Sequence, residues 1–128
     1  MNVPDNYFFT KEHEWAKIDG KKAKIGISDY AQHKLGDITF VELPAAGKQV
    51  KQFDVLTGLE SVKAASDVYA PLSGKVSAVN SGLETAPELV NKETYTGGWI
   101  AEIEIKDASE TKNLMDSAAY KKYIEGLE

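Results

Sequence analysis

Short apolar runs separated by glycine and proline residues fill most of the chain. This pattern is typical of a β-rich protein, because its strands are short and its turns need residues that interrupt regular structure. In Trp99–Ile105, apolar residues alternate with Glu102 and Glu104, so one face of a strand is apolar and the other is charged. The same reasoning predicts strands at Lys22–Ile27, Ile38–Leu43, Val55–Val62 (with a bulge at Gly58), Asp67–Ala70 and Lys75–Val79.

Helical patterns are few. Ser28–Gly36 combines an N-capping Ser, an acidic first turn, a basic last turn and a terminal Gly, which together favour a short helix. Pro87–Val90 predicts a single turn with Pro at its first position. Asp107 and Glu110 have the spacing of a capping box. Later apolar residues recur at helical spacing and predict a C-terminal helical segment: Ala119, Tyr120, Tyr123, Ile124 and Leu127.

The composition excludes several classes of function. The chain has 128 residues, which predicts one domain over residues 1–128, and a net charge of −5. All 15 basic residues are Lys, and the absence of Arg together with the acidic balance argues against a nucleic-acid partner. The chain has no Cys, which excludes disulfides, thiolate metal sites and thiol nucleophiles. Because neither a membrane-spanning run nor a signal peptide is evident, we expect a cytoplasmic protein with no membrane partner.

A conventional active site is difficult to assemble from this sequence. Of the two His residues, His33 is interpreted as a cation at a helix C-terminus. His13 lies between Glu12 and Glu14, but one His at this spacing favours solvated polar residues over a metal clip. The sequence contains no P-loop, dinucleotide fingerprint or nucleophile elbow. We therefore predict neither a metal site nor a catalytic centre.

One lysine has distinctive neighbours. Lys63 follows one short strand candidate and precedes another, in a tight segment of small residues. Ala64, Ala65 and Ser66 leave its amine sterically open, as an enzyme that acylates one particular lysine requires. A lysine on a turn is ordinarily only a solvated charge. Composition and spacing alone do not distinguish Lys63 from the other lysines.

The segment Glu60–Pro71 around this lysine resembles the lipoylation motif of the glycine cleavage system H protein family. Further matches occur in the same order along nearly the whole chain, at Thr10–Trp15, Gly26–Gln32, Leu35–Asp37, Phe40–Pro44, Pro87–Asn91, Tyr95 with Gly98 and Trp99, and the tail around Tyr120. The resemblance implies a mainly β, lipoyl/biotinyl-type barrel-sandwich hybrid with short helices and a helical C-terminal segment. Lys63 would then lie on a hairpin tip.

The resemblance also implies a carrier that has no catalytic turnover of its own. Lys63 would hold lipoate in amide linkage and accept the aminomethyl group left by glycine decarboxylase, the P-protein. An aminomethyltransferase, the T-protein, would move the one-carbon unit to tetrahydrofolate, and a dihydrolipoyl dehydrogenase, the L-protein, would reoxidise the dithiol. We expect a monomer that a lipoate-attaching enzyme also recognises.

Two alternative functions remain open at this point. Some H proteins donate lipoyl groups to other enzymes, which is a role in protein modification. A β module that is never lipoylated would have the same fold, because fold alone does not define function.

The resemblance further implies a cleft that shields the loaded arm. Glu14 and Asp67, with Glu12 nearby, match positions where carboxylates bind the ammonium of the arm by charge-assisted hydrogen bonds. The alternative for each is an ordinary solvated carboxylate or a turn cap.

Three more residues match positions that matter for acceptance by the lipoylating enzyme. They are Glu60, Gly47 and Gly74. We expect Glu60 to contact that enzyme directly. We expect the two glycines to set the turns that present the hairpin, because Gly enters positive φ freely.

Overall fold

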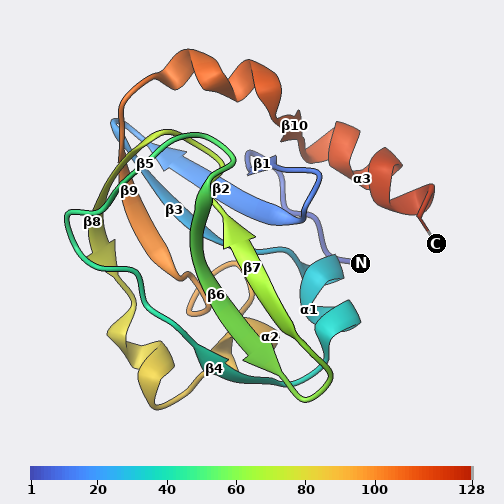
Figure 1. Cartoon of the computed structure of the whole chain (residues 1–128). Helices are drawn as coiled ribbons and strands as arrows, with labels where there is room; N and C mark the ends of the chain where they lie inside the picture. The colour runs from blue at the N-terminus through green and yellow to red at the C-terminus, as the bar shows by residue number, and fades with distance from the viewer. Residues whose placement is uncertain (128) are drawn as a thin grey trace.

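The computed structural model describes residues 1–127, which form two antiparallel β-sheets that face one another (Figure 1). In this part of the chain, seven strands form the larger sheet in the order β10-β1-β2-β3-β9-β8-β5, and three form the smaller sheet in the order β4-β6-β7. The strands are β1 (Phe8–Phe9), β2 (Glu14–Asp19), β3 (Lys22–Ile27), β4 (Ile38–Val41), β5 (Gln49–Val50), β6 (Val55–Ser61), β7 (Ala65–Tyr69), β8 (Gly74–Val79), β9 (Ala101–Ile105) and β10 (Met115–Asp116).

The main hydrophobic core fills the space between the two sheets. Ala101 and Ile103 of β9 are fully buried, whereas Glu104 is exposed, which confirms the predicted alternation. Leu59 of β6 and Val68 of β7 enter the same core from the smaller sheet. Each such side chain contributes about 1.5–3 kcal/mol when it is fully buried. The hairpin of β6 and β7 therefore rests on a packed and rigid base.

The six predicted strands are all present, to within two residues at either end. The register of β6 against β7 shifts between Val55 and Thr57, so the bulge predicted at Gly58 is wrong in position. The prediction missed β1, β2, β5 and β10. Three of these strands have only two residues, which is too short for a periodic pattern.

Helix α1 (Asp29–Leu35) confirms the helix predicted at Ser28–Gly36. The Ala31 N–H donates to the Ser28 hydroxyl at 3.2 Å, and Gly36 ends the helix with φ of +77°. Helix α2 (Leu89–Lys92) begins two residues after Pro87, and the Val90 N–H donates to the Pro87 carbonyl at 3.1 Å, which confirms the single turn predicted at Pro87–Val90. A 3-10 turn, η1 (Ser81–Glu84), precedes it.

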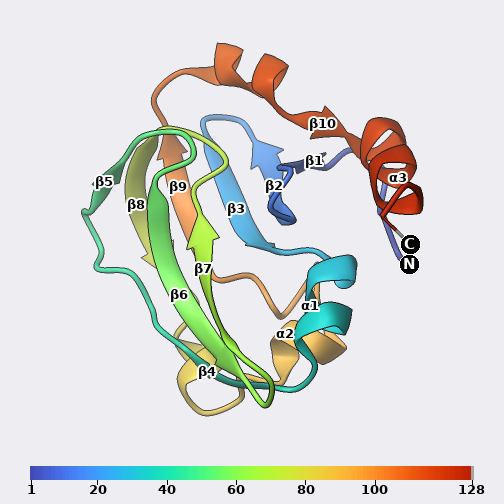
Figure 2. The same cartoon turned by 45° about the vertical axis from the view of Figure 1, so that its right-hand side comes forward.

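The C-terminal segment consists of a 3-10 helix, η2 (Ala108–Asn113), and helix α3 (Ser117–Glu125). Asp107 caps η2 by accepting from Ser109, but the predicted capping box is wrong, because the Glu110 carboxylate accepts from the N–H and hydroxyl of Ser73. Tyr120 and Ile124 anchor α3 in an aromatic cluster with Phe9 and Trp15, whereas Leu127 is exposed. Helix α3 lies at the other end of the molecule from the β6–β7 turn (Figure 2).

Candidate functional site

The hairpin of β6 and β7 ends in the turn Ser61–Ala64, which contains Lys63 (Figure 2). The Ser61 N–H donates to the Ala64 carbonyl at 2.8 Å. The Ser61 hydroxyl accepts from the N–H groups of Lys63 and Ala64 at 3.2 Å each. These local bonds fix the backbone of the turn, while the side chains of Val62, Lys63 and Ala64 are exposed.

The connection between α1 and β4 supports this turn from the side. The Val62 N–H donates to the Asp37 carbonyl at 3.0 Å. A Cβ atom placed on Gly36 would lie 3.5 Å from Cε of Lys63, so the stem of the lysine lies against this glycine. No carboxylate within residues 1–127 forms an ion pair with Lys63. The amine is therefore exposed and unpaired on a backbone that is held from two sides.

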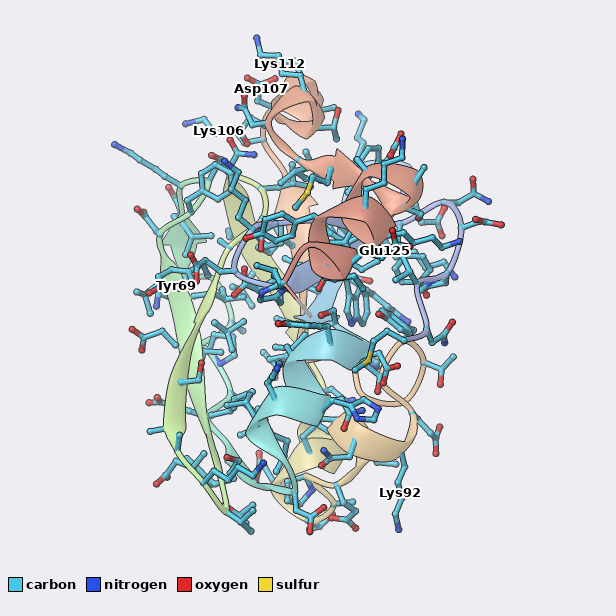
Figure 3. All side chains as sticks on the ribbon, turned by 90° about the vertical axis from the view of Figure 1, so that its right-hand side faces the viewer. Tyr69, Lys92, Lys106, Asp107, Lys112 and Glu125 are labelled. Carbon is cyan, nitrogen blue, oxygen red and sulfur yellow. The ribbon has the colours of Figure 1, made fainter. Side chains whose placement is uncertain are left out.

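A cleft of about 490 Å³ lies beside the other end of β7. Its lining includes Glu14 at the start of β2, Phe53 from the turn between β5 and β6, and Tyr69 at the end of β7. Figure 3 shows Tyr69 on the side of the molecule formed by the β6–β7 hairpin. The strand extends about 13 Å from Ala65 to Tyr69, at about 3.3 Å per residue. The cleft and the Lys63 turn are thus joined by the length of one strand.

Glu14 lies at the floor of the cleft and is only 1% exposed. The Thr10 hydroxyl donates to its Oε1, and the Tyr69 N–H donates to its Oε2 at 3.3 Å. Burial raises the pKa of Glu14 to about 7, against the lowering effect of these two hydrogen bonds, and the charge of Glu12 adds to the rise. No cation pairs with Glu14 within the described residues. Because a buried carboxylate without a counter-ion is costly, the raised pKa favours the protonated form of Glu14 below about pH 7.

The other two predicted cleft residues are placed differently. Glu12 is exposed and lines the same cleft as Glu14. Asp67 does not line it. It is exposed on the outer face of β7, where it borders a separate depression of about 300 Å³ over Gly58. Along β7, Asp67 lies between the Lys63 turn and Tyr69, so it borders the path from the turn to the cleft.

Among the predicted recognition residues, only Glu60 is near the turn, exposed at the end of β6. Gly47 has φ of +89°, as expected, and its N–H donates to the Val76 carbonyl of β8 at 2.8 Å. Gly74 does not have positive φ, so that expectation is wrong. A Cβ atom there would lie 2.1 Å from the Glu104 carbonyl oxygen, so Gly74 is needed for the close approach of β8 and β9. Both glycines stabilise the larger sheet and lie outside the hairpin.

The prediction that His13 is a solvated residue is also wrong. His13 is half-buried with φ of +74°, and its Nδ1 lies 2.8 Å from the Tyr120 hydroxyl. Its ring centroid is 4.6 Å from that of Tyr30, and burial lowers its pKa. His13 therefore links α3 to the turn that precedes Glu14.

Five residues that line the cleft were not singled out from the sequence: Thr10, Lys11, Phe53, Tyr69 and Asn113. Thr10 and Tyr69 lie within segments that carry the family resemblance, so their place in those motifs was the available signal. Phe53 has a weaker signal, which is a large apolar residue in the otherwise polar run Lys51–Asp54.

Residues 1–127 contain no candidate metal site and no helix that could span a membrane. This part of the chain has no group of three His, Asp or Glu side chains that could hold a metal ion. None of its helices is long and apolar enough to cross a membrane.

A two-sheet β-fold that presents an exposed lysine on a rigid hairpin matches the architecture of the lipoyl-type carrier domains. The family model for the glycine cleavage H-protein matches residues 7–126. The chain is 49% identical over 128 residues to the glycine cleavage system H protein of Halothermothrix orenii, with 100% of both chains covered. It is 50% identical over 127 residues to a probable glycine cleavage system H protein of Thermococcus gammatolerans, covering 98% of this chain and 94% of that one.

A solved structure agrees with these sequence comparisons. The crystal structure of a glycine cleavage system H protein from Mycobacterium marinum superposes with a TM-score of 0.84 at 28% identity, covering 97% of this chain and 98% of that one. The chain belongs to the glycine cleavage system H protein family. Proteins of this family are the non-catalytic lipoyl carriers of the glycine cleavage system, and this role and the barrel-sandwich fold confirm the predictions from sequence.

Proposed function

We propose that Lys63 is the lipoylated residue of this carrier. The observation that carries the proposal is an exposed lysine without an ion-pair partner, on a turn whose backbone is fixed by Ser61 and Asp37. An amide at this amine would remove a charge that nothing in the described chain neutralises. The lipoyl group, when bound, supplies the disulfide chemistry that a chain without Cys lacks.

The partners in this proposal are the P-protein, the T-protein, the L-protein and the lipoate-attaching enzyme. All four must reach Lys63, and the hairpin end is open enough for this, because Val62 and Glu60 are both exposed beside it. A monomer in the cytoplasm, acting as one domain over residues 1–128, is consistent with successive visits to separate enzymes. In this proposal Glu60 contacts the lipoate-attaching enzyme, whereas Gly47 and Gly74 act by stabilising the sheet beneath the hairpin.

The cleft at Glu14 has a second part in the proposed function. An arm that carries an aminomethyl group has a cationic end, and Glu14 is a buried carboxyl group without a counter-ion. A shielded charge-assisted hydrogen bond contributes about 1.5–3 kcal/mol. In this account Glu14 holds the ammonium group, Glu12 adds negative potential at the rim, and Asp67 borders the path along β7.

The lifetime of the loaded arm tests this role. Glu14→Ala should shorten that lifetime, measured as formaldehyde release from preloaded protein, while lipoylation and reoxidation of the dithiol proceed at the parent's rates. Equal release rates in the variant and the parent would show that Glu14 does not hold the arm.

Reconstitution tests the carrier function itself. The lipoylated chain is mixed with the P-, T- and L-proteins, glycine, tetrahydrofolate and NAD, and NADH formation is followed. The parent should support turnover and Lys63→Arg should not. A parent that is lipoylated at Lys63 and yet inactive here, but that transfers lipoyl groups to an apo-dehydrogenase domain, would replace the carrier function by the donor function.

A further inference from the structure

Phe53 is an exposed aromatic residue in a strained conformation at the Glu14 cleft. It lies in the turn between β5 and β6 with φ of +69°, and it is 48% exposed. Positive φ is unusual for a residue with a bulky side chain. Phe53 also belongs to none of the hydrophobic clusters formed by the described residues. Neither backbone preference nor core packing therefore explains a phenylalanine at this position.

The surrounding structure fixes this unfavourable conformation. The Phe53 N–H donates to the Ala70 carbonyl at 2.7 Å, and the Ala70 N–H donates to the Asp54 carbonyl at 2.8 Å. The side-chain amide of Gln52 donates to the Pro71 carbonyl at 2.9 Å and to the Glu110 carbonyl at 3.0 Å. Strained residues persist where their neighbours over-determine them, and they cluster at ligand sites. The turn thus holds the phenyl ring at the cleft, joined both to the end of β7 and to η2.

The position of the ring relative to Glu14 suggests its use. Both side chains line the same cleft of about 490 Å³, the carboxyl group at its floor and the ring as an exposed part of its lining. An ammonium group is attracted both to a carboxylate and to the face of an aromatic ring. The one basic residue among those that line the cleft, Lys11, is exposed and forms no ion pair with Glu14. A ring beside a bound ammonium also excludes water from it.

We infer that Phe53 is a binding residue for the cationic end of the loaded arm, covering it by cation–π contact while Glu14 binds it from the floor of the cleft. The inference rests on the proposed function, because it takes the arm on Lys63 as the source of the ammonium. It adds an aromatic wall to the binding site, and it explains why a strained and exposed phenylalanine is present there.

The absence of Cys allows a test that does not depend on lipoylation. Lys63→Cys introduces a single thiol, which is alkylated with a long flexible arm that ends in a primary amine. A matched arm with an acetylated amine is the control. NMR measures two quantities. They are the nuclear Overhauser contacts between the arm and the rings of Phe53 and Tyr69, and the fraction of the arm that is docked. We expect the amine arm to dock and the acetylated arm to remain free.

Substitutions at position 53 then separate the contributions of the ring. Phe53→Gly should weaken docking of the amine arm about threefold to tenfold, the range typical of one cation–π contact. Phe53→Trp should retain docking, and the docked fraction of Phe53→Leu should lie between those of Phe53→Gly and the parent. Phe53→Gly should also raise the thermal midpoint, because Gly accepts positive φ without strain, which shows that lost docking is not lost folding.

The outcomes distinguish this inference from the function on which it rests. Docking that is equal in the parent and in Phe53→Gly, but lost in Glu14→Gln, would overturn the role of Phe53 and leave the cleft intact. Docking of neither arm in any variant would overturn the inference and the cleft together. Lipoylation of Lys63, measured separately by mass, would be unaffected by either result.

Discussion

The Lys63 turn and the Glu14 cleft lie at opposite ends of β7 and are built in opposite ways. The turn is exposed, and its hydrogen bonds join residues within three positions of one another, apart from the single bond from the Val62 N–H to the Asp37 carbonyl. The cleft is assembled from residues as distant as Thr10 and Asn113, and its central carboxyl group is almost completely buried. An attachment point must be accessible to several enzymes, whereas a shield must exclude water, and the two environments correspond to these two tasks.

Lys63→Arg should have the largest effect on function and almost none on stability. Arg cannot form the amide, and a side chain on an exposed turn has little packing to lose. Activity in the reconstituted system should be abolished, while the thermal midpoint stays within about 2 °C, since surface substitutions usually change stability by less than about 0.5 kcal/mol. Lys92→Arg is the matched control, because Lys92 is also exposed and points away from the body of the molecule (Figure 3). Residual modification of Lys63→Arg would mean that another lysine is the attachment site.

Glu14→Gln should change how stability depends on pH. The folded-state pKa of Glu14 is about 7, above the ordinary value of 4.5. The stabilising effect of its protonated form is therefore fully present below pH 4.5 and is lost as pH rises to about 7. At 1.36 kcal/mol per pKa unit, the loss amounts to about 3 kcal/mol, and Gln, which cannot ionise, avoids it.

Urea unfolding of both proteins from pH 4.5 to 8 measures this difference. The free energy of unfolding of Glu14→Gln relative to the parent should increase by about 3 kcal/mol over that range. A constant difference would show that Glu14 titrates at an ordinary pKa and that the cleft floor is wet.

Gly74→Val should damage the fold, and lipoylation only as a consequence. A Cβ atom at Gly74 would lie 2.1 Å from the Glu104 carbonyl oxygen, so β8 and β9 must separate. Overpacking of this kind costs about 1–3 kcal/mol. Urea unfolding at fixed pH measures the loss, and Lys75→Val, an exposed neighbour on the same strand, is the control. Normal stability combined with poor lipoylation would instead assign Gly74 to direct recognition.

Glu60→Ala should have the smallest effect, confined to the hairpin. Its exposed side chain makes no side-chain hydrogen bond or ion pair within residues 1–127, so stability should be unchanged. Loss of a contact worth about 1.4 kcal/mol to the lipoate-attaching enzyme would slow lipoylation about tenfold. Initial lipoylation rates measured by intact mass test this, with the exposed Glu42→Ala as a control outside β6. An unchanged rate removes Glu60 from the recognition surface.

The Lys63 turn was easier to predict from the sequence than the Glu14 cleft, and the difference has a physical reason. The hairpin was predictable because its two strands are close together in the sequence and strand alternation is a local property. The predicted strands Val55–Val62 and Asp67–Ala70 lie on either side of Lys63. The cleft was not predictable, because its lining brings Glu14 together with Phe53 and Tyr69, which are distant in sequence, and the Tyr69 N–H that donates to Glu14 is 55 positions away. His13 illustrates the same limit, since its partner Tyr120 is 107 positions away.

Residue-resolved mass spectrometry of the hairpin peptide tests the central claim most directly. The full chain is incubated with lipoate, ATP and a lipoate-attaching enzyme, and is then digested and sequenced by fragmentation. The account predicts one lipoyl group per chain, located on Lys63, and no modification of the other 14 basic residues. A chain that stays unmodified while a known acceptor domain in the same tube is lipoylated, or a lipoyl group on any other lysine, would contradict the account.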